Sequence, residues 1–311
     1  MYKIGVDLGG TNIAAGITNS NGELILKDSI KTKKNGSPQE IIKDIFVICN
    51  KVMIDKNLTE EEIKHIGIGV PGTCSNSTGI VSFAPNINFK NINLRSEMAN
   101  HTKIPISIEN DANCAALGES IKGAAKDYKN SLTVTLGTGV GAGIVIDGNL
   151  IRGNVEVGHH TININGPLCG CGNMGCFESY ASATSLIKVA REVSINNPTK
   201  ILKYAGGDIN KIEAKNVFDA KEENDKWAVE LIKNYIFYLS VGINNLINCY
   251  PLQAVIIGGG ISKQGDNLII PLKEELKSRS FGGEFNIDIL TARLGNDAGI
   301  IGSAELESKI S

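Results

Sequence analysis

The stretch IGVDLGGTNIAAGIT at residues 4–18 decides the fold class, because it contains two apolar strand patterns joined by a glycine turn. Residues 19–22, NSNG, are a second turn signal, and residues 23–30 continue as a third strand pattern. We therefore expect the chain to open with three antiparallel strands connected by tight hairpins.

The tip of the first hairpin carries residues that suit a phosphate group. Gly9 and Gly10 place no side chain between the backbone N–H groups and a ligand, and Thr11 adds a hydroxyl. Asp7 ends the first strand, where its carboxylate can reach a Mg²⁺ ion or its water ligands. The pattern is typical of a nucleotide-phosphate site, and an ordinary tight hairpin is the alternative.

A second glycine hairpin, VTLGTGVGAGIVI, occupies residues 134–146. A dinucleotide-binding fingerprint requires a helix after its glycines, whereas the β-branched residues 144–146 indicate a strand. Two similar hairpins about 130 residues apart predict two similar α/β domains with one nucleotide in the cleft between them.

A candidate metal site lies in EVGH at residues 156–159 and CGCGNMGCFE at residues 169–178. One imidazole and three thiols are the donor set of a closed, structural zinc site: His159, Cys169, Cys171 and Cys176. A disulfide is disfavoured because a Cys-Gly-Cys pair closes a very tight loop, and no apolar periodicity would bury these thiols. The flanking acids Glu156 and Glu178 predict that the metal supports a binding pocket.

Asp111 is the candidate catalytic carboxylate. The strand pattern IPISIE at residues 104–109 ends at Asn110, and residues 112–121 follow as a helix of small residues. A carboxylate at a strand end beside a helix N-terminus suits catalysis at the mouth of an α/β sheet, although position alone favours an N-cap.

Two weaker candidates are Asn86 and Gly259. Asn86 follows Pro85 in a polar loop, where its amide could contact a hydroxylated ligand or serve a turn. Gly259 belongs to the run VIIGGG at residues 255–260, where glycine lets an adenine ring or a ribose approach the backbone. A tight strand-to-helix turn is the alternative for the glycines.

The composition excludes some classes of partner. The 31 basic and 33 acidic residues give a net charge of −2, which offers no electrostatic attraction to nucleic acid or to an anionic membrane. The sequence shows neither a signal-peptide pattern nor an apolar run of membrane-spanning length, and its seven cysteines fit a reducing compartment. We therefore expect a cytoplasmic protein.

Taken together, the motifs resemble the ROK family of sugar kinases and repressors over essentially the whole chain. The matching segments are DLGGTN at 7–12, PG at 71–72, ENDAN at 109–113, LGTGVGAG at 136–143, EVGH at 156–159 and the cysteine motif at 169–178. The resemblance implies an actin-like, ribonuclease-H-like α/β fold of two domains, with ATP and a sugar in the interdomain cleft. We expect a smaller domain at 1–118 plus 297–311 and a larger one at 119–296 that carries the zinc loop.

The resemblance also implies a role for individual residues. Asp111 becomes the general base. The implied sugar contacts are Gly72, Asn86, Asn110, Asp111, Glu156, His159 and Glu178. The implied contacts to the nucleotide and its Mg²⁺ are Asp7, Gly9, Gly10, Thr11, Asn12, Gly137, Thr138, Gly139 and Gly259. Family members commonly form homodimers or higher homo-oligomers, which we expect here.

The implied reaction is phosphorylation of a hexose by ATP, a transferase step of carbohydrate metabolism. We expect glucose as the acceptor, at its 6-hydroxyl, because residues 181–184, ASAT, look glucokinase-like. Kinases for N-acetylmannosamine, N-acetylglucosamine, fructose or allose share every motif, and polyphosphate is an alternative donor. A sugar-sensing repressor is disfavoured because the first hairpin begins by residue 7, and an actin-like assembly ATPase has no use for the zinc loop.

Overall fold

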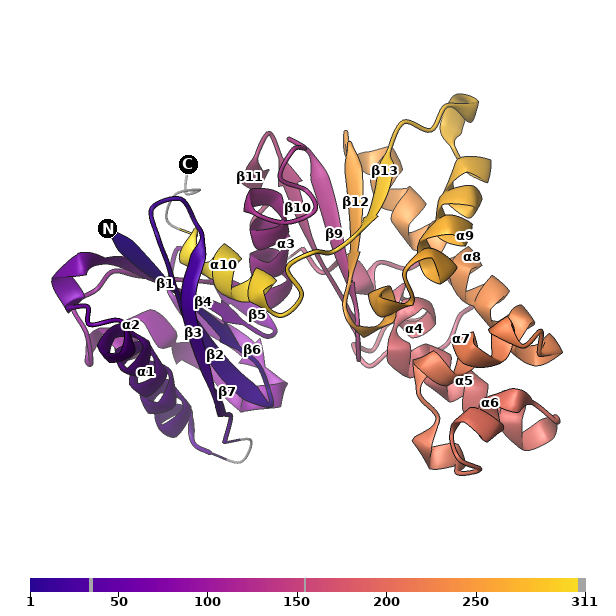
Figure 1. Cartoon of the computed structure of the whole chain (residues 1–311), viewed down its shortest axis with the longest axis horizontal. Helices are drawn as coiled ribbons and strands as arrows, with labels where there is room; N and C mark the ends of the chain where they lie inside the picture. Colours follow the sequence, from indigo (N-terminus) through magenta and orange to yellow (C-terminus); the bar gives the residue numbers. More distant parts are fainter. Residues whose placement is uncertain (34–35, 154, 307–311) are drawn as a thin grey trace. The chain divides into compact units, whose positions relative to one another are not determined.

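The computed structural model describes residues 1–33, 36–153 and 155–306 (Figure 1). The chain divides into two compact units. The first unit contains residues 1–133, 143–155 and those from Arg293 on, and the second contains residues 134–142 and 156–292. The domain boundaries expected from the sequence stay a prediction.

The first unit is built on a five-stranded sheet in the order β3-β2-β1-β4-β8. Its strands are β1 (Tyr2–Leu8), β2 (Asn12–Thr18), β3 (Leu24–Lys31), β4 (Ile63–Val70) and β8 (Ile106–Asn110). Strand β2 pairs antiparallel with both β1 and β3, which confirms the three antiparallel strands expected at the start of the chain. Strands β4 and β8 continue the sheet in parallel with β1.

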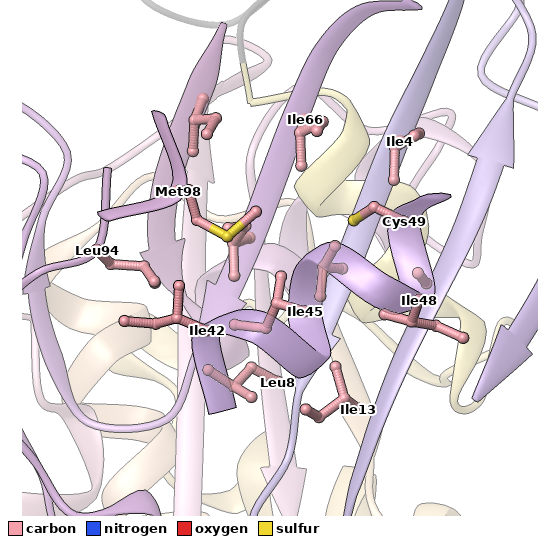
Figure 2. Close-up of a cluster of buried hydrophobic side chains, with 14 of the residues drawn as sticks. Ile4, Leu8, Ile13, Ile42, Ile45, Ile48, Cys49, Ile66, Leu94 and Met98 are labelled. Atoms are coloured by element: carbon pink, nitrogen blue, oxygen red, sulfur yellow. The ribbon is translucent and has the colours of Figure 1, made fainter. Parts of the chain in front are cut away.

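Helix α1 (Pro38–Asp55) covers one face of this sheet. It begins where Ser37 and Glu40 form a capping box, followed by a proline in the first turn. Its apolar residues recur with helical periodicity and pack against the strands, as Figure 2 shows. The labelled core residues are Ile4, Leu8, Ile13, Ile42, Ile45, Ile48, Cys49, Ile66, Leu94 and Met98.

Helices α3 (Asp111–Ile121) and α10 (Asp297–Ala304) pack against each other, and α10 also contacts β1, β2 and β4. The approach of α10 to the sheet is close. A Cβ at Gly5 would lie 1.8 Å from the carbonyl oxygen of Ile300, and one at Gly67 would lie 1.7 Å from that of Ser303. Only glycine therefore allows α10 to lie directly on β1 and β4, and this brings its first turns to the end of β1 that carries Asp7.

The remaining elements of the first unit form a small antiparallel layer. A three-stranded sheet has the order β5-β6-β7, from β5 (Thr73–Ser75), β6 (Ile80–Ala84) and β7 (Phe89–Asn93). Helix α2 (Leu94–Ala99) follows β7. Two short 3-10 helices are η1 (Glu60–Glu62) and η2 (Pro85–Ile87).

A second five-stranded sheet has the order β11-β10-β9-β12-β13. Its strands are β9 (Ser131–Leu136), β10 (Val140–Ile146), β11 (Asn149–Leu150), β12 (Ala254–Gly258) and β13 (Asp288–Thr291). When the strands of each sheet are numbered in chain order, both sheets have the same spatial order: third, second, first, fourth, fifth. The glycine hairpin joins the first two strands in each case, so the internal repeat seen in the sequence is also a repeat of topology.

Apart from β12, β13 and its parts of β9 and β10, the second unit is mainly helical. Its longest helix is α8 (Lys226–Cys249), which contacts α4, α5, α7 and α9. The other helices are η3 (Val157–His159), α4 (Glu178–Ala181), α5 (Ala183–Asn196), α6 (Lys200–Tyr204), η4 (Ile209–Lys211), α7 (Ala214–Glu222), η5 (Gly260–Gln264), α9 (Asp266–Ser278) and η6 (Phe281–Gly283). Within residues 1–33, 36–153 and 155–306, no helix has the length and apolarity needed to span a membrane.

Candidate functional site

The tip of the β1–β2 hairpin is held in shape by the end of β3. The N–H of Gly9 donates to the carbonyl oxygen of Asn12 at 2.9 Å. Thr32 donates from its hydroxyl to the carbonyl of Gly9 at 2.6 Å and from its N–H to the carbonyl of Thr11 at 2.9 Å. Gly9 thus shapes the turn, while Thr11 and Asn12 are exposed at the tip.

Gly10 brings the hairpin tip close to the loop that carries Asn86. A Cβ at Gly10 would lie 3.3 Å from the Cβ of Asn86, which is exposed in η2. Two candidates from different parts of the sequence, one for phosphate and one for sugar, are therefore neighbours in the first unit.

Asp7 lies near the end of β1, beside α10, and its carboxylate interacts electrostatically with Asp111. A Cβ at Gly299 of α10 would be 3.2 Å from the carboxyl carbon of Asp7. Burial, and to a smaller extent the negative charge of Asp111, together raise the pKa of Asp7 to about 6. Two carboxylates whose negative charges interact in this way favour the binding of a divalent cation near them.

Asp111 is the first residue of α3, and its neighbour Asn110 is the N-cap. The Asn110 side-chain oxygen accepts from the N–H groups of Ala112 at 2.9 Å and Asn113 at 3.2 Å. The alternative reading of Asp111 as the N-cap is therefore wrong. Its carboxylate accepts from the N–H of Ala112 at 2.8 Å and is half-buried.

Gly72 fixes the loop after β4 against Asn110. Its carbonyl oxygen accepts from the side-chain amide of Asn110 at 3.0 Å. Its φ is 90°, and a Cβ there would lie 2.3 Å from the carbonyl oxygen of Phe83. The position thus requires glycine, and its contribution is the carbonyl that orients Asn110.

Sequence reasoning missed Glu109, the residue before Asn110. Its side chain is buried, and one carboxylate oxygen accepts from the N–H of Asn110 at 3.0 Å and from the side-chain amide of Asn113 at 3.1 Å. Its other oxygen lies 3.8 Å from Nε of Arg152. A charged residue inside an otherwise apolar strand pattern was the available signal.

The second hairpin is held by the segment that follows the cysteine motif. The N–H of Gly137 donates to the carbonyl of Gly139 at 3.0 Å. The carbonyl of Gly137 accepts from the N–H of Ala183 at 2.8 Å, and that of Thr138 accepts from the hydroxyl of Thr184 at 2.7 Å. The start of α5 therefore determines how this hairpin is presented.

Glu178 also contacts the second hairpin. Its carboxylate accepts from the N–H of Val140 at 2.9 Å, and a Cβ at Gly139 would lie 2.2 Å from the same carboxylate oxygen. Glu178 was expected as a sugar contact only. Because its backbone is two residues from Cys176, it links the cysteine motif directly to the candidate nucleotide hairpin.

Gly259 lies against the strand that leads into this hairpin. It has a φ of 80°, and a Cβ there would lie 2.4 Å from the carbonyl oxygen of Leu136. The absence of a side chain lets the end of β12 pack against the end of β9. The second unit thus brings Gly259 close to the residues that precede Gly137.

The four predicted metal ligands form one cluster. Their ligand atoms all lie within 4.8 Å of one another, with 3.7 Å between Cys169 Sγ and His159 Nδ1 and 3.6 Å between Cys171 Sγ and Cys176 Sγ. Ligands about 2.3 Å from a tetrahedral zinc ion are spaced by about 3.8 Å, so the donor set fits the ion.

The cysteine loop is anchored through Phe177. Isolated β-bridges pair Thr161 with Cys176 and Leu168 with Met174. Phe177 is fully buried, and a Cβ at Gly242 of α8 would lie 2.2 Å from its ring. The loop is therefore exposed at Cys171, whereas Phe177, the residue before Glu178, is buried against α8.

Glu156 opens the short helix η3, which carries His159. Its carbonyl oxygen accepts from the N–H of His159 at 3.0 Å, and its side chain is exposed. Each unit thus gathers its own set of candidates. The first unit pairs Gly10 with Asn86, Gly72 with Asn110, and Asp7 with the charge of Asp111. The second unit groups the glycine hairpin, Gly259, Glu178 and the cysteine cluster.

The chain belongs to the ROK family, whose sequence profile matches residues 3–310. It is similar to the glucokinase of Halalkalibacterium halodurans, with 37% identity over 98% of this chain and 94% of that protein. It is also 32% identical to the xylose repressor of Bacillus subtilis, over 98% of this chain and 76% of the repressor.

The chain is also similar in structure to a solved member of this family. The ROK family glucokinase from Streptomyces griseus, in complex with glucose and AMPPNP, matches with a TM-score of 0.82 and 30% identity, covering 98% of this chain and 99% of that one. The family and this structural match confirm the predicted actin-like α/β fold.

Proposed function

We propose that the chain is an ATP:hexose phosphotransferase that transfers the terminal phosphate of ATP to the 6-hydroxyl of glucose. The observation that carries this proposal is the placement of Asp111, on the first turn of α3 beside the capping Asn110, where its charge acts on Asp7. The relatives supply the context: one is named a glucokinase, and the other is a glucokinase in complex with glucose and AMPPNP.

In the proposed reaction Asp111 is the general base. It accepts the proton of the attacking hydroxyl while the new oxygen–phosphorus bond forms and the bond to the leaving ADP breaks. Mg²⁺, when bound, supplies positive charge that stabilises the phosphate oxygens. Asp7 holds the ion or its water ligands. Its pKa is raised because, with no cation bound, ionising this carboxylate in its buried position near Asp111 costs free energy.

The two glycine hairpins contact the nucleotide in this proposal. On the first hairpin we assign Gly10, Thr11 and Asn12 to the phosphates and Mg²⁺, with Gly9 shaping the turn through its own hydrogen bond. The second hairpin contributes Gly137, Thr138 and Gly139, and Gly259 lies beside the strand that leads into it. Glycine at these positions lets phosphate and ribose approach the backbone.

The sugar is assigned to residues whose side chains present amide, imidazole and carboxylate groups. They are Asn86, Asn110, Asp111, Glu156, His159 and Glu178, with Gly72 acting through its carbonyl bond to Asn110. Hydroxyl groups of a hexose can both donate to the carboxylates and accept from the amides.

The cysteine cluster would hold one zinc ion as a structural element. Its four protein ligands leave no coordination position for a water molecule or substrate, so the ion takes no part in the chemistry. Its role would be to hold His159 and the chain next to Glu178 in place for the sugar.

The family also contains regulators, and the similarity to the xylose repressor makes a sugar-sensing protein the second candidate. Catalysis is favoured because the carboxylate pair Asp7 and Asp111 suits metal-assisted phosphoryl transfer, which sugar sensing does not require. A cytoplasmic location, a place in glycolysis, a homo-oligomeric state and the absence of a nucleic-acid partner belong to the same proposal.

The test is a coupled assay of ADP release with purified protein, ATP and Mg²⁺. Glucose, N-acetylmannosamine, N-acetylglucosamine, fructose and allose are compared as acceptors in this assay. Polyphosphate, which releases no ADP, is compared with ATP as donor by measuring the sugar phosphate that forms. We expect the highest kcat/KM with glucose and ATP. A preference for another sugar would correct the substrate, and the absence of ADP release with all five would overturn the enzymatic proposal.

A further inference from the structure

Glu109 is a buried carboxylate beside the candidate base that none of the roles above uses. Its side chain is 6% exposed. One of its oxygens accepts from the N–H of Asn110 and from the side-chain amide of Asn113. Because Asp111 lies between these two residues in the chain, Glu109 is bonded to the backbone just before the base and to the Asn113 side chain just after it.

Arg152 supplies the charge that balances Glu109. Its Nε lies 3.8 Å from the second carboxylate oxygen of Glu109, and its Nη2 donates to the carbonyl oxygen of Leu306 at 3.0 Å. Leu306 is fully buried against Cys114 and Leu117 of α3. The guanidinium is therefore fixed at a second point, and a buried carboxylate of this kind is costly without its cation.

We propose that Glu109 and Arg152 are positioning residues for the phosphoryl transfer, because their ion pair holds the first turn of α3 and thereby the direction of the Asp111 carboxylate. This inference rests on the proposed function. Neither residue touches a substrate in this account; both act through Asp111. Since a misplacement of about 1 Å can slow an enzyme by about 10²-fold, the loss on breaking the pair falls on kcat.

The experiment compares Arg152→Met, Glu109→Gln and the double variant in the ADP-release assay. We expect Arg152→Met to lower kcat by about 10-fold or more while the KM values for glucose and ATP change by less than about 3-fold. The double variant should recover part of the lost kcat, because glutamine keeps an acceptor for the Asn110 N–H and no longer leaves a buried charge unpaired.

Arg95→Met is the matched control. Arg95 also anchors β8, since its Nε donates to the carbonyl of Ile106 at 3.0 Å, but it binds at the opposite end of the strand from Asn110. We expect this variant to lower the Tm and to leave kcat at 25 °C unchanged. Arg152→Lys, which keeps the charge, should have an intermediate kcat and serves if Arg152→Met fails to fold by circular dichroism.

The inference is overturned by a normal kcat in folded Arg152→Met, by an equal loss of kcat in Arg95→Met, or by a double variant whose loss is the product of the two single losses. A parent protein with no sugar-dependent ADP release overturns the proposed function and this inference with it. An active parent with a fully active Arg152→Met overturns only the inference.

Discussion

At the scale of the single residue, the ionised carboxylate of Asp7 lowers the free energy of unfolding, and the proposed function explains why an acid stands there. Its pKa is about 6 in the folded protein against an ordinary value of 3.8. The folded state thus binds this proton more tightly than the unfolded state, so the penalty is present above about pH 6 and disappears as the pH falls toward 3.8.

We therefore predict that Asp7→Asn stabilises the unliganded protein and abolishes kinase activity. A shift of this size corresponds to about 3 kcal/mol as an upper bound, at a pH above both pKa values. Thermal unfolding without Mg²⁺ or nucleotide should show a higher Tm for the variant at pH 7.5 and a smaller difference at pH 4.5. A lower Tm at pH 7.5, or a difference that does not change with pH, would contradict the assignment.

Gly137 allows a second test at the residue scale. A Cβ at this position would meet nothing within 4 Å, so Gly137→Val places a branched side chain in open space without disturbing the fold. We expect the affinity for a non-hydrolysable ATP analogue to fall by about 10-fold or more by calorimetry, because the side chain would occupy the space of a phosphate. Unchanged nucleotide affinity with a normal Tm would remove Gly137 from the nucleotide site.

At the scale of the element, three consecutive residues connect the cysteine loop and α4 to the second hairpin. Cys176 is a candidate metal ligand, Phe177 is buried in the helical core, and Glu178 accepts from the N–H of Val140. Loss of the metal should therefore displace the proposed sugar contacts and, to a smaller extent, the hairpin that contains Gly137.

The corresponding variant is Cys171→Ser. We predict about one zinc per chain in the parent protein and little in the variant, a lower Tm, a strongly raised KM for the sugar and a smaller rise in the KM for ATP. Atomic absorption and the ADP-release assay measure these quantities. Cys249→Ser is the matched control, since Cys249 is an exposed cysteine outside the cluster. A metal-free parent with full activity would contradict the structural role of zinc.

Local patterns predicted the elements that depend on local chemistry. The glycine hairpins, the three opening strands and the four donors of the cysteine cluster each have a signature in adjacent residues. Asp111 was located correctly at the strand end, but the cap was assigned only by the structure, because Asn110 and Asp111 are both good capping residues.

The sequence could not predict contacts made by the fold. Glu109 and Arg152 are 43 positions apart, and Glu178 and Val140 are 38 apart, so no local periodicity reports either pair. The close packing of α10 on β1 through Gly5 has the same origin. Such partners are chosen by tertiary packing, and a buried charge in an apolar strand was the only local sign of one of them.

At the scale of the whole molecule, the two sheets repeat one strand order, and each has a glycine hairpin between its first two strands. This repetition was predicted from the two hairpins, and the ROK family match over residues 3–310 confirms the fold class. Within that fold, this chain combines the carboxylate pair Asp7 and Asp111 with the cysteine cluster.

The most direct test of the account is the glucose-dependent release of ADP by Asp111→Asn beside the parent protein, with glucose binding measured by calorimetry on both. Asparagine keeps the shape of the side chain and removes its ability to take a proton. We predict that kcat falls by about 10²-fold or more while the glucose Kd changes by less than about 3-fold. A variant that keeps near-normal kcat would contradict the central claim that Asp111 is the general base of a hexose kinase.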